Sequence, residues 1–200
     1  MQTKHSSKVR WAILALTVGV LCIIAAAMIY THPWRGNNSD SNVKWSLTLV
    51  GINNEQRILS YDEIKAMPYY EGQGGFFTTV GVINGPYKVR GVPVIDLCEM
   101  VGGMTSSDIL FVSAQDGYSA VFGYDQVTGN LDTYDPKTMA VTPHKELKLI
   151  LAYKLNGKPL SDDSGKPLRL AAVGSDDLLT EGHYWVKWVN KLEVVRQNNN

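Results

Sequence analysis

The stretches GKPLRLAAVG (165–174) and HYWVKWVNKLEVV (183–195) are largely apolar, and both predict β-strands. Arg169 lies inside the first stretch and Lys187 inside the second. A charge within a strand is unfavourable unless the side chain points outward or has a partner. Alternation along a strand allows the outward orientation for each residue taken singly. The alternative is that both cations converge on an anionic ligand such as a phosphate.

The segments around these stretches predict a sheet-rich α+β domain over residues 43–195. Further strands are predicted at 44–51, 75–83, 87–91, 108–115, 117–124 and 147–157. Asn84–Gly85–Pro86 is predicted to be the turn between two of these strands. One short helix is predicted to begin after Ser60, with Glu63 completing a capping box. A second helix is predicted over 92–103.

The composition excludes some classes of partner and site. The chain has 200 residues, of which 44% are hydrophobic, and its 19 basic and 19 acidic residues balance. This balance gives no support to a nucleic-acid partner. Cys98 is the single cysteine of the predicted domain, so an internal disulfide and a multi-cysteine metal site are both excluded there. We expect Cys98 to be a buried core residue on the apolar face of the second helix.

The first forty residues predict a membrane anchor. Residues 11–30 contain no charge, and at 1.5 Å per residue they would form a helix of about 30 Å, enough to cross a bilayer. Residues 1–10 carry Lys4, Lys8 and Arg10, which predicts a cytoplasmic leader and an extracytoplasmic domain. Residues 31–42 form a polar linker and 196–200 a polar tail. The alternative is a signal peptide cleaved near Ala25–Ala27, after which the domain would be secreted.

Other sites receive little support from the sequence. The four histidines have no metal-ligand spacing, and no G-x-S-x-G motif is present. The glycines of EGQGGFF (71–77) are not followed by Lys-Ser or Lys-Thr, so they predict a turn or a close backbone contact instead of a phosphate loop. The acidic segment 161–165 lacks the spacing of a calcium loop.

The order of the motifs resembles the molybdopterin-binding domain of the sulfite oxidase superfamily. The most specific pieces are G-K-P-L-R (165–169) and V-K-W (186–188), supported by R-G-V-P-V-I-D-L (90–97). The resemblance implies a mixed α+β fold that cradles one molybdopterin. It also implies that Arg169 and Lys187 bind the pterin and its phosphate, and that Tyr118 corresponds to an active-site tyrosine.

The sequence also departs from this family at two positions. Family enzymes bind molybdenum through one cysteine thiolate, and the resemblance puts that position at or next to Thr79. A neutral hydroxyl cannot replace a soft, anionic thiolate in kind. Ser164 stands where sulfite oxidases tend to have histidine. The resemblance therefore implies molybdopterin as the cofactor, whereas the missing thiolate argues against molybdenum.

Two functions follow from these departures. The first is a non-catalytic or atypical module that binds a pterin or another small anionic ligand. The alternative is an active molybdopterin oxidoreductase with non-cysteine metal ligation. The sequence contains no haem-attachment motif and no iron–sulfur cysteines, so an active enzyme would need a separate redox or protein partner.

Overall fold

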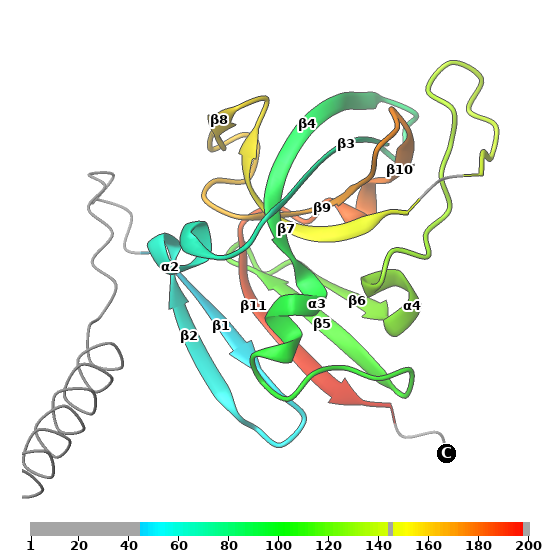
Figure 1. The fold of residues 1–200 in the computed structure, drawn as a ribbon. Coiled ribbons are helices and arrows are strands. Elements are labelled where there is room, and N and C mark those ends of the chain that lie inside the picture. Colours follow the sequence, from blue (N-terminus) through cyan, green and yellow to red (C-terminus); the bar gives the residue numbers. More distant parts are fainter. Residues whose placement is uncertain (1–44, 144–145, 198–200) are drawn as a thin grey trace, which may run out of the picture. The chain divides into compact units, whose positions relative to one another are not determined.

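Two mixed β-sheets organise the domain (Figure 1). The computed structural model describes residues 45–143 and 146–197. The first sheet has five strands, in the order β2 (Gln56–Ser60), β1 (Ser46–Val50), β11 (Val189–Arg196), β5 (Asp108–Ala114) and β6 (Ser119–Gly123). In this sheet β1 and β11 are parallel, and the other pairs are antiparallel.

The second sheet has six strands. Its order is β10 (Leu179–Glu181), β3 (Tyr70–Phe77), β4 (Ile83–Pro93) and β7 (Lys148–Leu155), and both β8 (Lys158–Pro159) and β9 (Arg169–Val173) pair with β7. The helices are short: α2 (Tyr61–Ala66), α3 (Val94–Glu99), α4 (Tyr124–Val127) and the 3₁₀ turn η1 (Gly182–Tyr184). The predicted sheet-rich α+β class is confirmed for the described residues.

Burial along the strands follows their place in the fold. In β5 the residues alternate between buried and partly exposed, as expected when one face of a sheet lies on the core. All five residues of β9 are buried, which explains why its sequence is an apolar run without alternation. Cys98 on α3 is 2% exposed within the same core, as the sequence predicted.

The predicted start of the first helix and its capping box are confirmed. The Ser60 hydroxyl accepts a hydrogen bond from the Glu63 amide at 3.2 Å, and the Glu63 carboxylate accepts one from the Ser60 amide at 2.8 Å. This reciprocal pair is the capping box, and it fixes the start of α2. The glycines of 71–77 also behave as predicted, because β3 runs so close to its neighbours that a Cβ at Gly72 or Gly75 would clash with backbone.

The predicted turn between β3 and β4 is wrong. We expected the turn at Asn84–Pro86, but β3 ends at Phe77 and those residues lie inside β4. The chain reverses at 78–82, where the Thr78 amide donates to the Val82 carbonyl, the Thr78 carbonyl accepts from the Gly81 amide, and the Thr78 hydroxyl accepts from the Val82 amide. Gly81 supplies the positive φ of +81° that this turn needs.

The stretch 183–195 is a strand only in its second half. Residues 182–184 form η1, and β11 begins at Val189. Trp188 adopts a left-handed φ of +53°, which interrupts the extended backbone. Lys187 therefore lies in the connection before β11. The prediction that it lies inside a strand is wrong.

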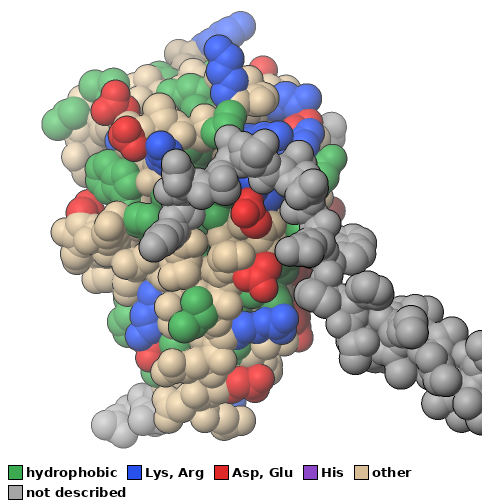
Figure 2. All heavy atoms as spheres, turned by 90° about the vertical axis from the view of Figure 1, so that its left-hand side faces the viewer, with side chains coloured by type: hydrophobic (Ala, Val, Ile, Leu, Met, Phe, Trp, Pro, Cys, Tyr) green, Lys and Arg blue, Asp and Glu red, His purple; other side chains and the backbone are tan. Residues whose placement is uncertain are grey.

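The predicted leader, anchor and linker (1–10, 11–30 and 31–42) lie outside the described residues, as does most of the tail. Among the residues that the structure describes, no helix has both the length and the apolar character needed to cross a membrane. Figure 2 shows that acidic and basic side chains are interspersed on the face it draws.

Asp108 predicts a specific loss of stability in acid. Its buried carboxylate accepts bonds from the Thr105 amide and hydroxyl and from Arg196 Nε at 2.6 Å. Burial alone would raise the pKa of Asp108, but these donors outweigh burial and hold its pKa below the ordinary 3.8. The stabilisation is therefore present above about pH 4 and lost as the pH falls through the lowered pKa.

We expect Asp108→Asn to unfold at a lower temperature than the unmodified protein at pH 6, with a gap that narrows between pH 4 and pH 2. Thermal unfolding of both proteins across this range measures the gap. An identical gap at pH 6 and pH 2 would show that the Asp108 charge does not contribute.

Candidate functional site

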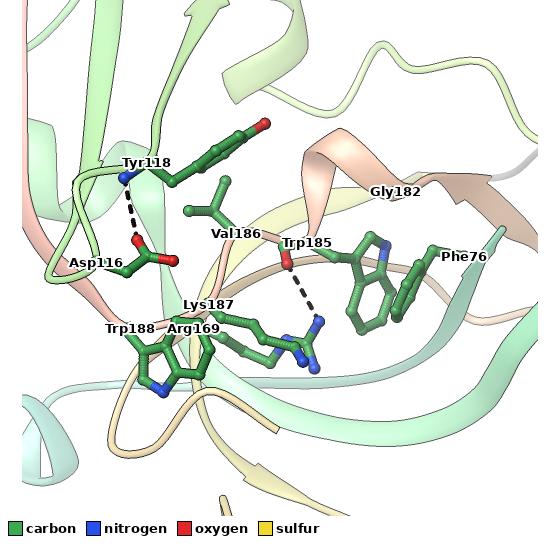
Figure 3. A pocket seen from close by; sticks show the side chains of 9 residues that line it. All are labelled: Phe76, Asp116, Tyr118, Arg169, Gly182, Trp185, Val186, Lys187 and Trp188. Carbon is green, nitrogen blue, oxygen red and sulfur yellow. Dashed lines mark hydrogen bonds between the residues drawn. The ribbon is translucent and has the colours of Figure 1, made fainter. Parts of the chain in front are cut away.

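A pocket of about 220 Å³ lies where the β5–β6 turn, the start of β9 and the connection from η1 to β11 meet (Figure 3). Its lining comes from segments far apart in the sequence. The lining residues are Phe76, Asp116, Tyr118, Arg169, Gly182, Trp185, Val186, Lys187 and Trp188.

Backbone pairing brings the two predicted cations to this pocket. The Leu170 amide donates to the Val186 carbonyl at 2.8 Å, and the Val189 amide donates to the Leu168 carbonyl at 3.0 Å. The edge of β9 is thereby paired with the connection that precedes β11. Arg169 and Lys187, which are 18 positions apart in the chain (187 − 169), consequently line the same cavity.

Arg169 is the first residue of β9 and is only 3% exposed. Its guanidinium carbon lies 5.5 Å from the ring centre of Phe76 and 5.2 Å from that of Trp185. Such contacts with aromatic faces stabilise a cation. The two rings stack on each other with their centres 5.1 Å apart, so this wall of the pocket is firmly packed.

The hydrogen bonds of Arg169 leave one buried donor without a partner, and its charge has no carboxylate in an ion pair among the described residues. Nη1 donates to the Ser164 carbonyl at 3.1 Å and Nη2 to the Trp185 carbonyl at 3.2 Å, while the buried Nε has no partner among the described residues. Burial lowers the pKa of Arg169 to about 10, so the group remains charged at neutral pH. A buried guanidinium bonded only to neutral carbonyls favours an anion beside it.

Lys187 supplies the second cation. Its ammonium lies 5.6 Å from the ring centre of Trp188, and the described residues provide no carboxylate in an ion pair with it. Gly165 lies directly against its stem, because a Cβ at Gly165 would be 2.8 Å from the Lys187 Cβ. The glycine of the G-K-P-L-R motif is therefore needed for the close approach of its loop to Lys187.

Tyr118 and Asp116 line the pocket from the β5–β6 turn. The Gln115 amide donates to the Trp188 carbonyl at 2.9 Å, which ties this turn to the connection before β11. Asp116 accepts a hydrogen bond from the Tyr118 amide at 3.0 Å through one carboxylate oxygen. Tyr118 is 49% exposed, and Figure 3 shows its ring directed away from the two cations.

The two positions where the sequence departs from the family differ in their distance from the pocket: Ser164 contacts a lining residue, whereas Thr79 does not line the pocket. Ser164 contributes its carbonyl to Arg169, and its hydroxyl is 2.9 Å from that of Ser161. Thr79 is exposed in the 78–82 turn and is not among the lining residues. Phe76, which lies three positions earlier, is the residue by which this hairpin reaches the pocket.

The lining suits an anionic, partly aromatic ligand but lacks a thiolate. Cys98 lies in the core, where burial raises the pKa of its thiol to about 12, so it remains protonated there. Within 45–143 and 146–197, no group of three or more histidine, cysteine, aspartate or glutamate side chains is arranged to hold a metal ion. The residues thus fit the phosphate and ring of a pterin, and they do not fit the usual thiolate ligation of molybdenum.

Sequence reasoning missed much of this lining. Val186 and Trp188 belong to the V-K-W motif, but the sequence predicts no role for them, and it predicts none for Phe76, Asp116, Gly182 and Trp185. No motif marks these last four residues, and they become neighbours only because three distant segments of the chain meet at the pocket.

Together, these features define a sheet-rich α+β domain with a cationic, aromatic-walled pocket at the junction of its loops. The chain belongs to the family described as the oxidoreductase molybdopterin binding domain, whose model matches residues 35–200. The resemblance to the sulfite oxidase superfamily is thereby confirmed.

Two similar proteins illustrate the relationship. The chain is 25% identical over 158 residues to the uncharacterized oxidoreductase YuiH of Bacillus subtilis (strain 168), covering 78% of this chain and 68% of that protein. The crystal structure of the sulfane dehydrogenase SoxCD from Paracoccus pantotrophus matches with a TM-score of 0.58 at 18% identity. That match covers 76% of this chain but only 38% of the matched chain, and it concerns the fold alone.

Proposed function

We propose that this protein is a binding module for molybdopterin or a closely similar anionic pterin, held through Arg169 and Lys187. The observation that carries the proposal is the buried Arg169 guanidinium, whose Nε has no partner and which forms no ion pair with a carboxylate among the described residues. A phosphate would accept from Nε and supply the missing negative charge. Lys187 would contribute a second, more flexible positive charge.

We further propose that the module does not carry out the usual redox chemistry of its family. When molybdenum is bound, the family's thiolate holds it, and no lining residue of this pocket is a cysteine. Threonine stands at or next to the corresponding position in the sequence, and its neutral hydroxyl is a poor substitute for thiolate.

The second candidate function is an active oxidoreductase with non-cysteine ligation. One observation favours it: Asp116 lines the pocket, and one of its carboxylate oxygens is engaged with the Tyr118 amide, which leaves the other as an anionic donor. Such an enzyme would exchange electrons with a separate redox or protein partner.

The proposed location is the outer face of a membrane. The charge-free residues 11–30 would anchor the chain once, with the amino end in the cytoplasm and the domain outside. Secretion after cleavage near Ala25–Ala27 is the alternative. Amino-terminal sequencing of the mature protein separates the two, because an anchored chain keeps all of residues 11–30, whereas a secreted chain would begin close to Ala25–Ala27.

The binding proposal is tested by Lys187→Met. The full chain is expressed in a host that makes molybdopterin and purified, and its bound pterin is quantified by oxidation to fluorescent products. Losing one charge-assisted contact should reduce pterin per protein by about tenfold. The matched control is Lys158→Met, which removes an exposed lysine of β8 outside the pocket lining and should retain the pterin.

Equal pterin in Lys187→Met and the unmodified protein would contradict the assignment of Lys187. Complete absence of pterin from the unmodified protein would contradict the proposed function itself.

A further inference from the structure

Trp188 is held in a backbone conformation that its side chain disfavours. Its φ of +53° lies in the left-handed region, which bulky residues seldom adopt. The other non-glycine residues with positive φ among those described are Asn54, Met139 and Asn156. Two of these are asparagines, which tolerate this conformation, whereas tryptophan does not.

The surrounding structure imposes this conformation. The Trp188 carbonyl accepts from the Gln115 amide at 2.9 Å, and the next amide, that of Val189, donates to the Leu168 carbonyl at 3.0 Å. These bonds dock the connection onto the β5–β6 turn on one side and onto the loop before β9 on the other. A glycine or asparagine would satisfy the same backbone bonds with less strain, so the backbone alone does not explain the indole.

The indole makes one contact that a residue without an aromatic ring could not make. It lines the pocket, and the Lys187 ammonium lies 5.6 Å from its ring centre (Figure 3). On the other side, Gly165 packs against the Lys187 side chain. A Cβ at Gly165 would lie only 2.8–2.9 Å from the Cα, Cβ and Cγ atoms of Lys187. The stem of Lys187 is thus confined by Gly165, and its charge is attracted to the ring of Trp188.

We infer that Trp188 is a positioning residue: its ring holds the Lys187 ammonium at the pocket, where it acts with Arg169 on one anion. This inference rests on the proposed anion-binding function. Fixing a long, flexible side chain before the ligand arrives removes part of the entropy loss on binding. The strained backbone at Trp188 is the structural consequence of placing an aromatic ring at this point of the turn.

A series of substitutions at Trp188 tests the inference with inorganic phosphate as the probe. The affinity of the full chain for phosphate is measured by calorimetry for the unmodified protein and for Trp188→Phe, Trp188→Leu and Trp188→Asn. Phenylalanine keeps an aromatic face, leucine keeps apolar bulk without one, and asparagine suits the left-handed backbone. We expect Phe to bind within about twofold of the unmodified protein, and Leu and Asn about two- to fivefold more weakly than Phe.

Thermal unfolding of the same proteins separates positioning from packing. Relief of backbone strain should leave the midpoint of Trp188→Asn no lower than that of Trp188→Leu, although both have lost affinity. The inference would be overturned if Trp188→Phe and Trp188→Leu bound phosphate equally well. It would also be overturned if affinity across the series followed the unfolding temperature and not the presence of an aromatic ring. Either result would leave the proposed function intact. Failure of the unmodified protein to bind phosphate at all would overturn both.

Discussion

Replacing Arg169 with methionine should reduce pterin retention by about tenfold to a hundredfold, the largest functional effect we expect. The variant removes the buried donor that has no partner and the charge that a phosphate would neutralise. Hydrogen bonds between charged groups are worth about 1.5–3 kcal/mol, which corresponds to this range of affinity. The measurement is pterin per protein after purification from a host that makes the cofactor.

The same variant should not lower the unfolding temperature of the ligand-free protein. Burial lowers the pKa of Arg169 to about 10, so below that pH the fold holds a charge that burial disfavours. Because the lowered pKa means that the folded protein loses this proton first, the free energy of unfolding should increase as the pH rises above about 10. At neutral pH, methionine removes the cost of burying the charged guanidinium.

Arg57→Met is the matched control for this experiment, because Arg57 is exposed on β2 and does not line the pocket. It should change neither retention nor stability. A strong loss of stability in Arg169→Met, together with an unchanged pterin content in the protein that remains folded, would show that Arg169 has a structural role only.

Gly74→Ala should be the most destabilising small change near the site. A Cβ at Gly74 would overlap the Ala172 carbonyl oxygen and lie 3.3 Å from Trp185 Cζ2, so β3 would have to move away from β9. Overpacking of this kind lowers the free energy of unfolding by about 1–3 kcal/mol. For a domain of this size we expect the unfolding midpoint to fall by roughly 5–10 °C.

The control for this change is Gly123→Ala. A Cβ at Gly123 would meet only Gln126 Oε1, at 3.9 Å, and the backbone there has an ordinary φ of −73°. Gly123 is the N-cap of α4, where alanine is less favourable than glycine, so the midpoint of Gly123→Ala should fall by about 2–4 °C at most, less than that of Gly74→Ala. If Gly74→Ala were tolerated equally well, the close approach of β3 to β9 would not contribute to stability.

Much of the fold could be predicted from local patterns. The residue pattern predicted β5 and β6, the capping box predicted α2, and the glycines of 71–77 predicted a turn or a close backbone contact, of which the structure shows the second. The errors came from turns. An Asn-Gly-Pro signal lies inside β4, because Thr78 and Gly81 already close the turn before it.

The candidate site could be predicted only in part, for a physical reason. Arg169 and Lys187 were conspicuous because charges in apolar stretches need an explanation, and the pocket indeed brings both together with Tyr118. Phe76 and Trp185 gave no such signal, because an aromatic residue in a sheet-rich protein is ordinarily a core residue. Their role follows from the guanidinium that they flank.

The 78–82 turn shows what family resemblance alone leaves unresolved. Thr79 was matched to the position of the metal-binding cysteine, yet it is exposed in the turn and outside the pocket lining. The pocket lining offers two cations, four aromatic rings and one carboxylate, and it contains no sulfur. Such a lining matches the organic part of the cofactor better than its metal.

The ratio of molybdenum to pterin in the purified full chain tests the central claim most directly. The protein is expressed in a host that makes the complete cofactor, molybdenum is measured by elemental analysis, and pterin is measured as its fluorescent oxidation products. We predict bound pterin with molybdenum far below one atom per pterin. One molybdenum atom per pterin, at full occupancy of the protein, would contradict the account and favour an active oxidoreductase with unusual ligation.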